Sequence, residues 1–251
     1  MASAFIFFDI PCKKSDKRWS LNTWKTRYTL HYKGLSYETQ WVEYPHIEEA
    51  CKKNGIPPLR KKPDGVSPHY TCPSLVDKST GAALTDSVQI AQYLDKTYPH
   101  TPRVFPNDSD GLQFAFAELH DQRLAPGWPL IFPAVAKILN PPSAEYFYRT
   151  RTQAFGKPLE ELIKSEEERV ETMKKFKGLW DALEAWYSKT DGPFLMGEVI
   201  SFADFVVASD VKFVLAAWGE GSVNWREFAT WHGGKWVRLT EEVDKACGIS
   251  G

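Results

Sequence analysis

The stretches Thr71-Cys72-Pro73-Ser74-Leu75 and Thr85-Asp86-Ser87-Val88-Gln89-Ile90 decide the fold of this 251-residue chain. In the first, a proline separates a short loop from a Ser-Leu-Val strand. The Cys72–Pro73 bond is therefore a candidate for the cis form, which X-Pro bonds adopt rarely and usually for a geometric reason. A cis bond here would turn the backbone N–H and C=O of Cys72 toward a peptide-like ligand.

The second stretch places an acid and a hydroxyl, Asp86 and Ser87, at the start of an apolar-periodic helix. Free N–H groups and the helix dipole favour a carboxylate at that position. A backbone clamp at Cys72 and a carboxylate seat at Ser87 together predict a site for a small acidic peptide.

Strands and helices alternate around these stretches in the first hundred residues. Apolar runs and alternation predict strands over 5–8, 37–41, 74–77 and 82–85, the last two closing a hairpin around Ser79-Thr80-Gly81. Helical patterns follow Ser20 as far as Gly34 and cover 47–53 and 88–98, while 57–68 is predicted to be a solvated loop. The order β-α-β-α-β-β-α predicts an open sheet with a parallel half.

The rest of the chain is predicted to be helical. Three prolines mark a linker over 99–106, so we expect an α/β domain over 1–100 and an all-α domain over 107–251. The segment Ala125-Pro126-Gly127-Trp128-Pro129 must kink or break a helix. Helices are predicted over 110–123, 130–139, 143–155, 165–188, 201–217 and 224–245.

Composition excludes several classes of function. A net charge of −1 and a pI near 6.6 give no electrostatic footprint for nucleic acid or an anionic membrane. The longest apolar stretch, 202–218, carries three charged residues and predicts no membrane span. The first residues do not read as a signal peptide, and the four cysteines show no C-x-x-C spacing, so we expect a soluble cytoplasmic protein with reduced thiols. The six histidines show no ligand spacing, and no metal site is predicted.

Ser20 is the first candidate for chemistry. It stands where a strand-to-helix loop meets the first helix, so its hydroxyl is either an N-cap acceptor or a donor toward the Cys72–Pro73 corner. Asn22, in the first helical turn, is a second candidate donor. Ser15 is a rival hydroxyl in a basic loop, and Cys12 would suggest a thiol-based enzyme.

The segment 19–28, Trp-Ser-Leu-Asn-Thr-Trp-Lys-Thr-Arg-Tyr, resembles the etherase-related Fungal A class of glutathione transferases and, more distantly, bacterial β-etherases. Their corresponding pattern is Ser-Pro-x-x-Trp-Lys/Arg-Thr, and Leu21 departs from it where proline is usual. The segments 41–45, 68–70, 146–151 and 155–157 agree with the same class. The resemblance implies a thioredoxin-like domain followed by a helical domain.

The resemblance also implies a serine-type site for glutathione. Ser20, with Asn22 beside it, would hydrogen-bond the glutathione sulfur and stabilise its thiolate, the nucleophilic form of a thiol whose pKa is ordinarily about 8.5. The backbone at Cys72–Pro73 and the pair Asp86 and Ser87 would hold the peptide, with Gln40 or Lys52 at its glycine carboxylate. The expected glutathione-binding residues are Cys72, Pro73, Asp86, Ser87 and Gln40.

Hydrophobic electrophiles are the implied second substrates. The thiolate would conjugate isothiocyanates or small aromatic electrophiles, or reduce hydroperoxides, in a cleft whose candidate walls are Trp128 and 146–148. The ten tryptophans also admit a ligandin that binds aromatic or polyphenolic compounds, and a β-aryl etherase is a third option. By contrast, Ser201 and Asp204 match a helix capping box and are expected to be structural.

The resemblance further implies a two-fold dimer, the commonest arrangement of soluble homo-oligomers. The helices over 88–98 and 110–123 would face the partner. Phe114 and Phe116 lie on different faces of the second helix, so we expect at least one to be free for an interface.

Overall fold

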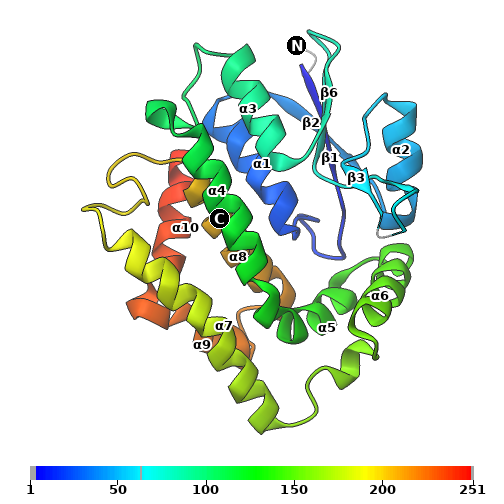
Figure 1. The fold of residues 1–251 in the computed structure, drawn as a ribbon, viewed down its shortest axis with the longest axis vertical. Coiled ribbons are helices and arrows are strands. Elements are labelled where there is room, and N and C mark those ends of the chain that lie inside the picture. Colours follow the sequence, from blue (N-terminus) through cyan, green and yellow to red (C-terminus); the bar gives the residue numbers. More distant parts are fainter. Residues whose placement is uncertain (1–3, 63, 250–251) are drawn as a thin grey trace.

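The computed structural model describes residues 4–62 and 64–249 and shows a sheet domain joined to a larger helical domain (Figure 1). The sheet domain ends with helix α3, and the helical domain begins with helix α4. This is a thioredoxin-like domain followed by an all-helical domain, as the sequence predicts.

Four strands form the central sheet in the order β2-β1-β5-β6, with β1 parallel to β2 and antiparallel to β5. On one face, Phe5 and Phe7 pack against helices α1 and α3; on the other, Phe8 belongs to a core that includes helix α2. The elements are β1 (Phe5–Asp9), α1 (Leu21–Tyr32), β2 (Tyr37–Trp41), α2 (Ile47–Lys53), β5 (Ser74–Asp77), β6 (Ala83–Thr85) and α3 (Ser87–Thr97).

The segment 57–68 is more ordered than a solvated loop. Strand β3 (Arg60–Lys61) pairs with β4 (Pro68–His69) in a small antiparallel ladder, which corrects the prediction. Two-residue strands are too short to show any alternation in sequence, and the prolines of this segment suggested a loop instead.

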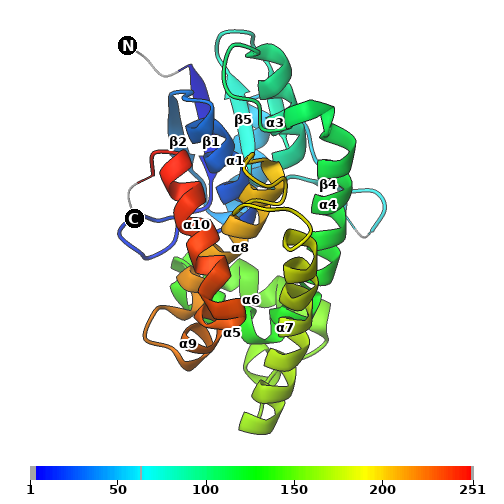
Figure 2. The same ribbon diagram turned by 90° about the vertical axis from the view of Figure 1, so that its left-hand side faces the viewer.

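Helix α8 is the core of the helical domain, packing against α1, α4, α5 and α10 (Figure 2). It is apolar around almost its whole circumference, as expected of a helix enclosed on all sides. The helices are α4 (Asp110–Arg123), α5 (Trp128–Ile138), α6 (Pro141–Phe155), α7 (Glu166–Tyr187), α8 (Phe202–Trp218), α9 (Val223–Ala229) and α10 (Lys235–Ala246), with single 3₁₀ turns η1 (Tyr44–His46), η2 (Pro106–Asp108), η3 (Ala125–Gly127), η4 (Leu159–Glu161) and η5 (Trp231–Gly234).

The predicted helix over 224–245 is wrong, because the chain breaks it into α9 and α10. His232, Gly233 and Gly234 all adopt left-handed backbone angles, with φ of 50°, 66° and 82°, which no α-helix can continue through. The predicted break near Pro126 is confirmed as the turn η3. Glycine is required at position 127, where a Cβ atom would lie 2.5 Å from the ring of Phe176.

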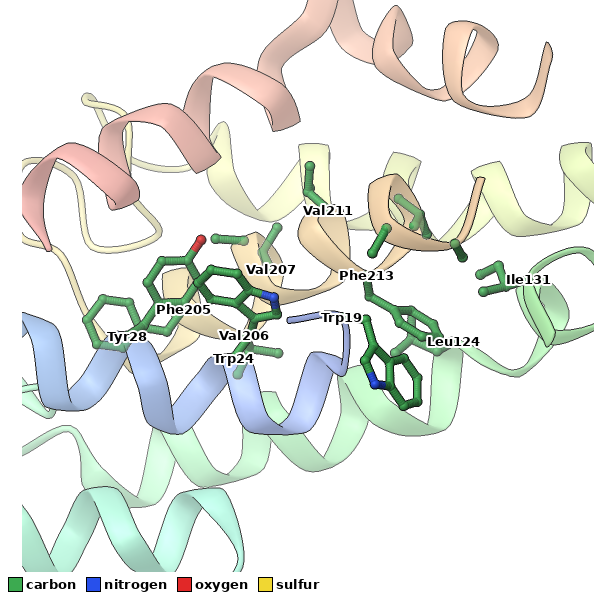
Figure 3. Packing of buried hydrophobic residues seen from close by; sticks show 14 of the residues in the cluster. Trp19, Trp24, Tyr28, Leu124, Ile131, Phe205, Val206, Val207, Val211 and Phe213 are labelled. Atoms are coloured by element: carbon green, nitrogen blue, oxygen red, sulfur yellow. The ribbon is translucent and has the colours of Figure 1, made fainter. Parts of the chain in front are cut away.

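The two domains share a continuous apolar core. Trp24 and Tyr28 of α1 lie against α8, where the rings of Tyr28 and Phe205 stack with centroids 5.7 Å apart (Figure 3). Asp95 fixes the linker by accepting hydrogen bonds from the backbone N–H groups of Val104 and Phe105. In the described part of the chain, no helix is both long and apolar enough to cross a membrane.

Candidate functional site

Four predicted site segments end at one edge of the sheet. Phe8, near the end of β1, pairs with Gln40 of β2 and with Ser74 of β5, and Ser74 pairs with Thr85 of β6. The loop leading to Ser20 leaves β1 at this edge, the Cys72–Pro73 corner enters β5 there, and Asp86 follows β6 there. The topology therefore gathers the predicted glutathione-binding residues from segments far apart in sequence.

Ser20 occupies the N-cap position of α1 without acting as a cap. Its backbone is extended (φ −72°, ψ 125°), and its side chain makes no capping hydrogen bond. The residue is only 5% exposed, and the loop before it is fixed by Trp19, whose indole N–H donates to the Ile10 carbonyl at 2.9 Å. Of the two alternatives for Ser20, this geometry favours a hydroxyl available to a ligand.

The Cys72–Pro73 bond, a candidate for the cis form from the sequence, is cis. Burial raises the pKa of the Cys72 thiol well above its usual value, and neighbouring Asp9 and Cys51 act in the same direction. The thiol is thus held in its protonated form at neutral pH. The groups of this corner that remain for a ligand are the backbone N–H and C=O of Cys72.

Asp86 and Ser87 begin α3 in an unusual conformation. Asp86 has a φ of 78°, a region that few residues other than glycine adopt, and its Oδ1 accepts hydrogen bonds from the N–H groups of Val88 (3.0 Å) and Gln89 (3.1 Å). Ser87 is the first helical residue and is buried. A non-glycine residue held at positive φ at the edge shared with Ser20 supports a binding role for this turn.

The remaining predicted polar residues differ in how free they are. Gln40 is exposed on β2, whereas its rival Lys52 pairs with Glu48 at 2.7 Å. Asn22 is exposed, and its carbonyl oxygen accepts a hydrogen bond from Lys25 at 3.2 Å. The structure thus leaves Gln40 the freer of the two candidates for a glycine carboxylate.

The rival nucleophiles have unfavourable surroundings. All four cysteines are free and buried, and burial raises the pKa of the Cys12 thiol. Ser15 is exposed in its basic loop. Among the described residues, no group of three or more His, Cys, Asp or Glu side chains is arranged to hold a metal ion.

An aromatic cluster lies where the two domains meet, beside Ser20. Trp19 contacts Tyr44 and Phe213, with ring centroids 6.3 and 6.0 Å away, and Tyr44 stacks on Tyr146 at 5.4 Å. Figure 3 shows Trp19 projecting from the loop before α1 toward Phe213 of α8. We define the aromatic cluster by its seven rings: Trp19, Tyr44, Trp128, Phe132, Tyr146, Phe147 and Phe213.

The sequence anticipated only part of this cluster. Trp128 stacks on Phe132 at 4.8 Å and belongs to it, as does Tyr146. Tyr148 does not: its hydroxyl donates to Glu160, and its ring lines a different cavity. Tyr44 was missed as a site residue, because nothing local in the sequence indicates that its ring meets a residue about a hundred positions later.

That different cavity, of about 560 Å³, lies on another face of α5. Its walls are largely apolar, with Lys137, Arg169 and Asn224 among the polar groups. It includes none of the predicted glutathione-site residues, and Trp128 and Phe132 are absent from its lining. A groove of about 480 Å³ beside Arg27, His31 and Tyr37 is equally separate from them.

A thioredoxin-like domain with a cis-proline corner, followed by a helical domain around one buried helix, defines the glutathione transferase fold. A family model for the N-terminal domain of glutathione S-transferases matches residues 19–97, and a model for the C-terminal domain matches residues 111–245. The chain belongs to the glutathione S-transferase family.

Three proteins similar to this chain come from fungi. The glutathione S-transferase-like protein ustS of Aspergillus flavus is 34% identical over 247 residues, covering 90% of this chain and 88% of that protein. Glutathione S-transferase CsGST63524 of Ceriporiopsis subvermispora, solved in complex with glutathione, superposes with a TM-score of 0.92 at 39% identity over 97% of this chain and 98% of that one. Glutathione transferase GSTFuA3 of Phanerochaete chrysosporium superposes with a TM-score of 0.87 at 41% identity over the full length of both chains.

Proposed function

We propose that this chain is a serine-type glutathione transferase of the etherase-related Fungal A class, which conjugates glutathione to hydrophobic electrophiles. Ser20 carries the proposal, because the residue is buried, its hydroxyl makes no cap, and it stands at the sheet edge where the Cys72–Pro73 corner and Ser87 meet. Glutathione bound to a similar solved relative supports the same co-substrate here.

In this mechanism the protein positions glutathione and stabilises its thiolate. The Cys72 backbone pairs with the peptide, the first turn of α3 receives the γ-glutamyl carboxylate, and Gln40 receives the glycine carboxylate. The Ser20 hydroxyl donates to the sulfur, and such a charge-assisted hydrogen bond lowers the thiol pKa. With an isothiocyanate, the sulfur lone pair forms a bond to the central carbon and the nitrogen takes a proton, giving a dithiocarbamate.

Ser20→Ala tests the assignment. Loss of one charge-assisted hydrogen bond should lower kcat/KM for phenethyl isothiocyanate and 1-chloro-2,4-dinitrobenzene by about 10- to 100-fold at neutral pH, because each pKa unit is worth about 1.36 kcal/mol. Glutathione binding, measured by calorimetry, should persist. Ser15→Ala is the matched control and should keep full activity, because its side chain is exposed.

Unchanged turnover in Ser20→Ala would refute the serine assignment. If Asn22→Ala lost conjugation activity and Ser20→Ala kept it, Asn22 would be the donor to the glutathione sulfur. Strong thiol transfer with no conjugation in the wild type would identify a cysteine-type enzyme.

The cavity on α5 favours a second candidate, a ligandin that binds aromatic compounds away from glutathione. Its volume of about 560 Å³ lies within the usual range for small-molecule sites, about 300–1,000 Å³. Binding of a fluorescent aromatic dye that persists in Ser20→Ala, with negligible turnover in the wild type, would support this function over conjugation.

A further inference from the structure

Arg151 is a half-buried cation that lies on the aromatic cluster without an acidic partner. Arg151 of α6 places its guanidinium 4.7 Å from the ring centroid of Phe147 and 5.6 Å from that of Phe132. Its hydrogen bond in the described chain goes to a neighbouring hydroxyl, Thr150 Oγ1, at 3.2 Å. No carboxylate lies within ion-pair distance of it in residues 4–62 and 64–249, although the side chain is half-buried.

The charge of Arg151 also reaches groups of the other domain. Burial raises the pKa of Tyr44 to about 12, and Arg151 is the largest influence in the opposite direction. The pKa of His69 is lowered by burial first, and by three cations that include Arg151. The guanidinium is thus close enough to Tyr44 and His69 to influence their ionisation.

Tyr44 adds a hydrogen-bond donor at the same place. Its hydroxyl has no hydrogen bond within the part of the chain that the structure describes, while its backbone N–H donates to Ser143 Oγ at 2.9 Å. Its ring is stacked on Tyr146 and is half-buried. The Tyr44 ring and the Arg151 guanidinium both contact Phe147, at 6.1 and 4.7 Å from its ring centroid, so the phenol and the cation belong to the same aromatic cluster.

A half-buried arginine without a carboxylate is suited to bind one. The planar guanidinium presents paired N–H donors that match a carboxylate in two parallel hydrogen bonds, and it loses little hydration in doing so. Of the neighbouring rings, Phe147 is buried, whereas Phe132 and Tyr44 are half-buried and offer stacking surface to a flat aromatic molecule. Two acids of the N-terminal domain near Tyr44 are already engaged. Glu43 accepts hydrogen bonds from Asn140 and Ser143, and Asp9 is paired with Arg27 at 2.7 Å.

We propose that Arg151 determines specificity by binding the carboxylate of an aromatic electrophile whose ring packs on Phe132 and Tyr44. The inference rests on the proposed function and narrows its substrates to aromatic acids. In the conjugation of 4-chloro-3-nitrobenzoate, the thiolate forms a C–S bond at the chlorinated carbon and chloride leaves with the bonding electron pair. The carboxylate takes no part in this displacement, so it can serve recognition alone.

The test compares 4-chloro-3-nitrobenzoate with its methyl ester in wild type, Arg151→Met, Arg151→Lys and Arg149→Met. Arg149 is the matched control: it lies two residues away on α6, is exposed, and stands over the Tyr146 ring at 5.4 Å. We expect Arg151→Met to lower kcat/KM for the acid about tenfold or more and for the ester less than about twofold. Arg151→Lys should retain part of the preference for the acid over the ester, and Arg149→Met should retain all of it.

Two kinetic outcomes would overturn the proposal. An equal loss for acid and ester would make Arg151 a packing residue. A raised KM for glutathione with an unchanged acid-to-ester ratio would mean that Arg151 binds a carboxylate of glutathione instead.

A binding measurement separates this inference from the proposed function. The glutathione conjugates of the acid and of the ester are titrated by calorimetry, which needs no turnover. Tighter binding of the acid conjugate to wild type, lost in Arg151→Met, supports the role of Arg151 even if conjugation is absent. Equal binding of the two conjugates to wild type overturns it even if conjugation is fast.

Discussion

At the scale of single residues, the site depends on which polar groups are left unused by the fold. Ser20 could be selected from sequence because it stands before a helix, but whether it caps that helix is decided by the backbone around it. The positive φ of Asp86 has no sequence signal either, since aspartate at an N-cap usually keeps an extended backbone. For Ser20 and Asp86, the sequence therefore predicted which residues would stand at the site, but not the backbone conformation that each adopts.

Cys12→Ser tests the alternative nucleophile. Burial raises the pKa of this thiol, so the thiolate is scarce at neutral pH and the substitution should change conjugation by no more than about twofold. Native protein should also react slowly with a thiol-specific dye, and quickly after unfolding, because all four cysteines are buried. Rapid labelling of the native protein at Cys12, together with lost activity in the variant, would contradict this.

At the scale of elements, strongly periodic segments were predictable and short ones were not. The sequence indicated α8 by its apolar run and by the capping residues Ser201 and Asp204, and the capping box is present. The break between α9 and α10 depends on left-handed angles at Gly233 and Gly234, a pair that the helical pattern around it concealed. The ladder of β3 and β4 was missed because it has two residues a strand.

Asp204→Ala should destabilise the protein by about 3 kcal/mol or more, measured by urea unfolding. The buried carboxylate accepts hydrogen bonds from Ser201, from the Leu195 N–H and from the Tyr187 hydroxyl, and its loss leaves these buried donors unpaired. Ser222→Ala, at the N-cap of α9, is the matched control and should cost about 1 kcal/mol. Equal losses would show that the Asp204 network contributes no more than an ordinary cap.

At the scale of the whole molecule, the order of elements predicts two domains, but their contact depends on residues that the sequence does not link. The carboxylate of Glu43 accepts hydrogen bonds from Asn140 and Ser143 at the start of α6, about a hundred positions away. The aromatic cluster has the same origin, since its rings come from both domains. A resemblance to a known family indicated the architecture, whereas these contacts between the domains are visible only in the folded chain.

We predict that the chain is a homodimer whose axis runs between α3 and α4. Of the two phenylalanines considered, Phe114 is 47% exposed, whereas Phe116 packs on His120 and Trp186. Leu112, on the same helix, is 78% exposed. Light scattering at micromolar concentration should give about twice the 28.6 kDa mass of the chain.

The double variant Leu112→Glu, Phe114→Glu should shift that mass toward the monomer, because it places charge on the apolar face. Val170→Glu, a comparably exposed position on α7, should leave the dimer intact. A wild-type mass near 28.6 kDa would refute the dimer, and dissociation by Val170→Glu alone would place its interface elsewhere.

The most direct test of the central claim is an ultraviolet titration of the glutathione thiolate bound to wild type and to Ser20→Ala. If Ser20 stabilises the thiolate, glutathione on the wild type should ionise at least about one pH unit below the ordinary thiol pKa of about 8.5. On Ser20→Ala the bound thiol should ionise near that ordinary value. Identical titration curves for the two proteins would contradict the account.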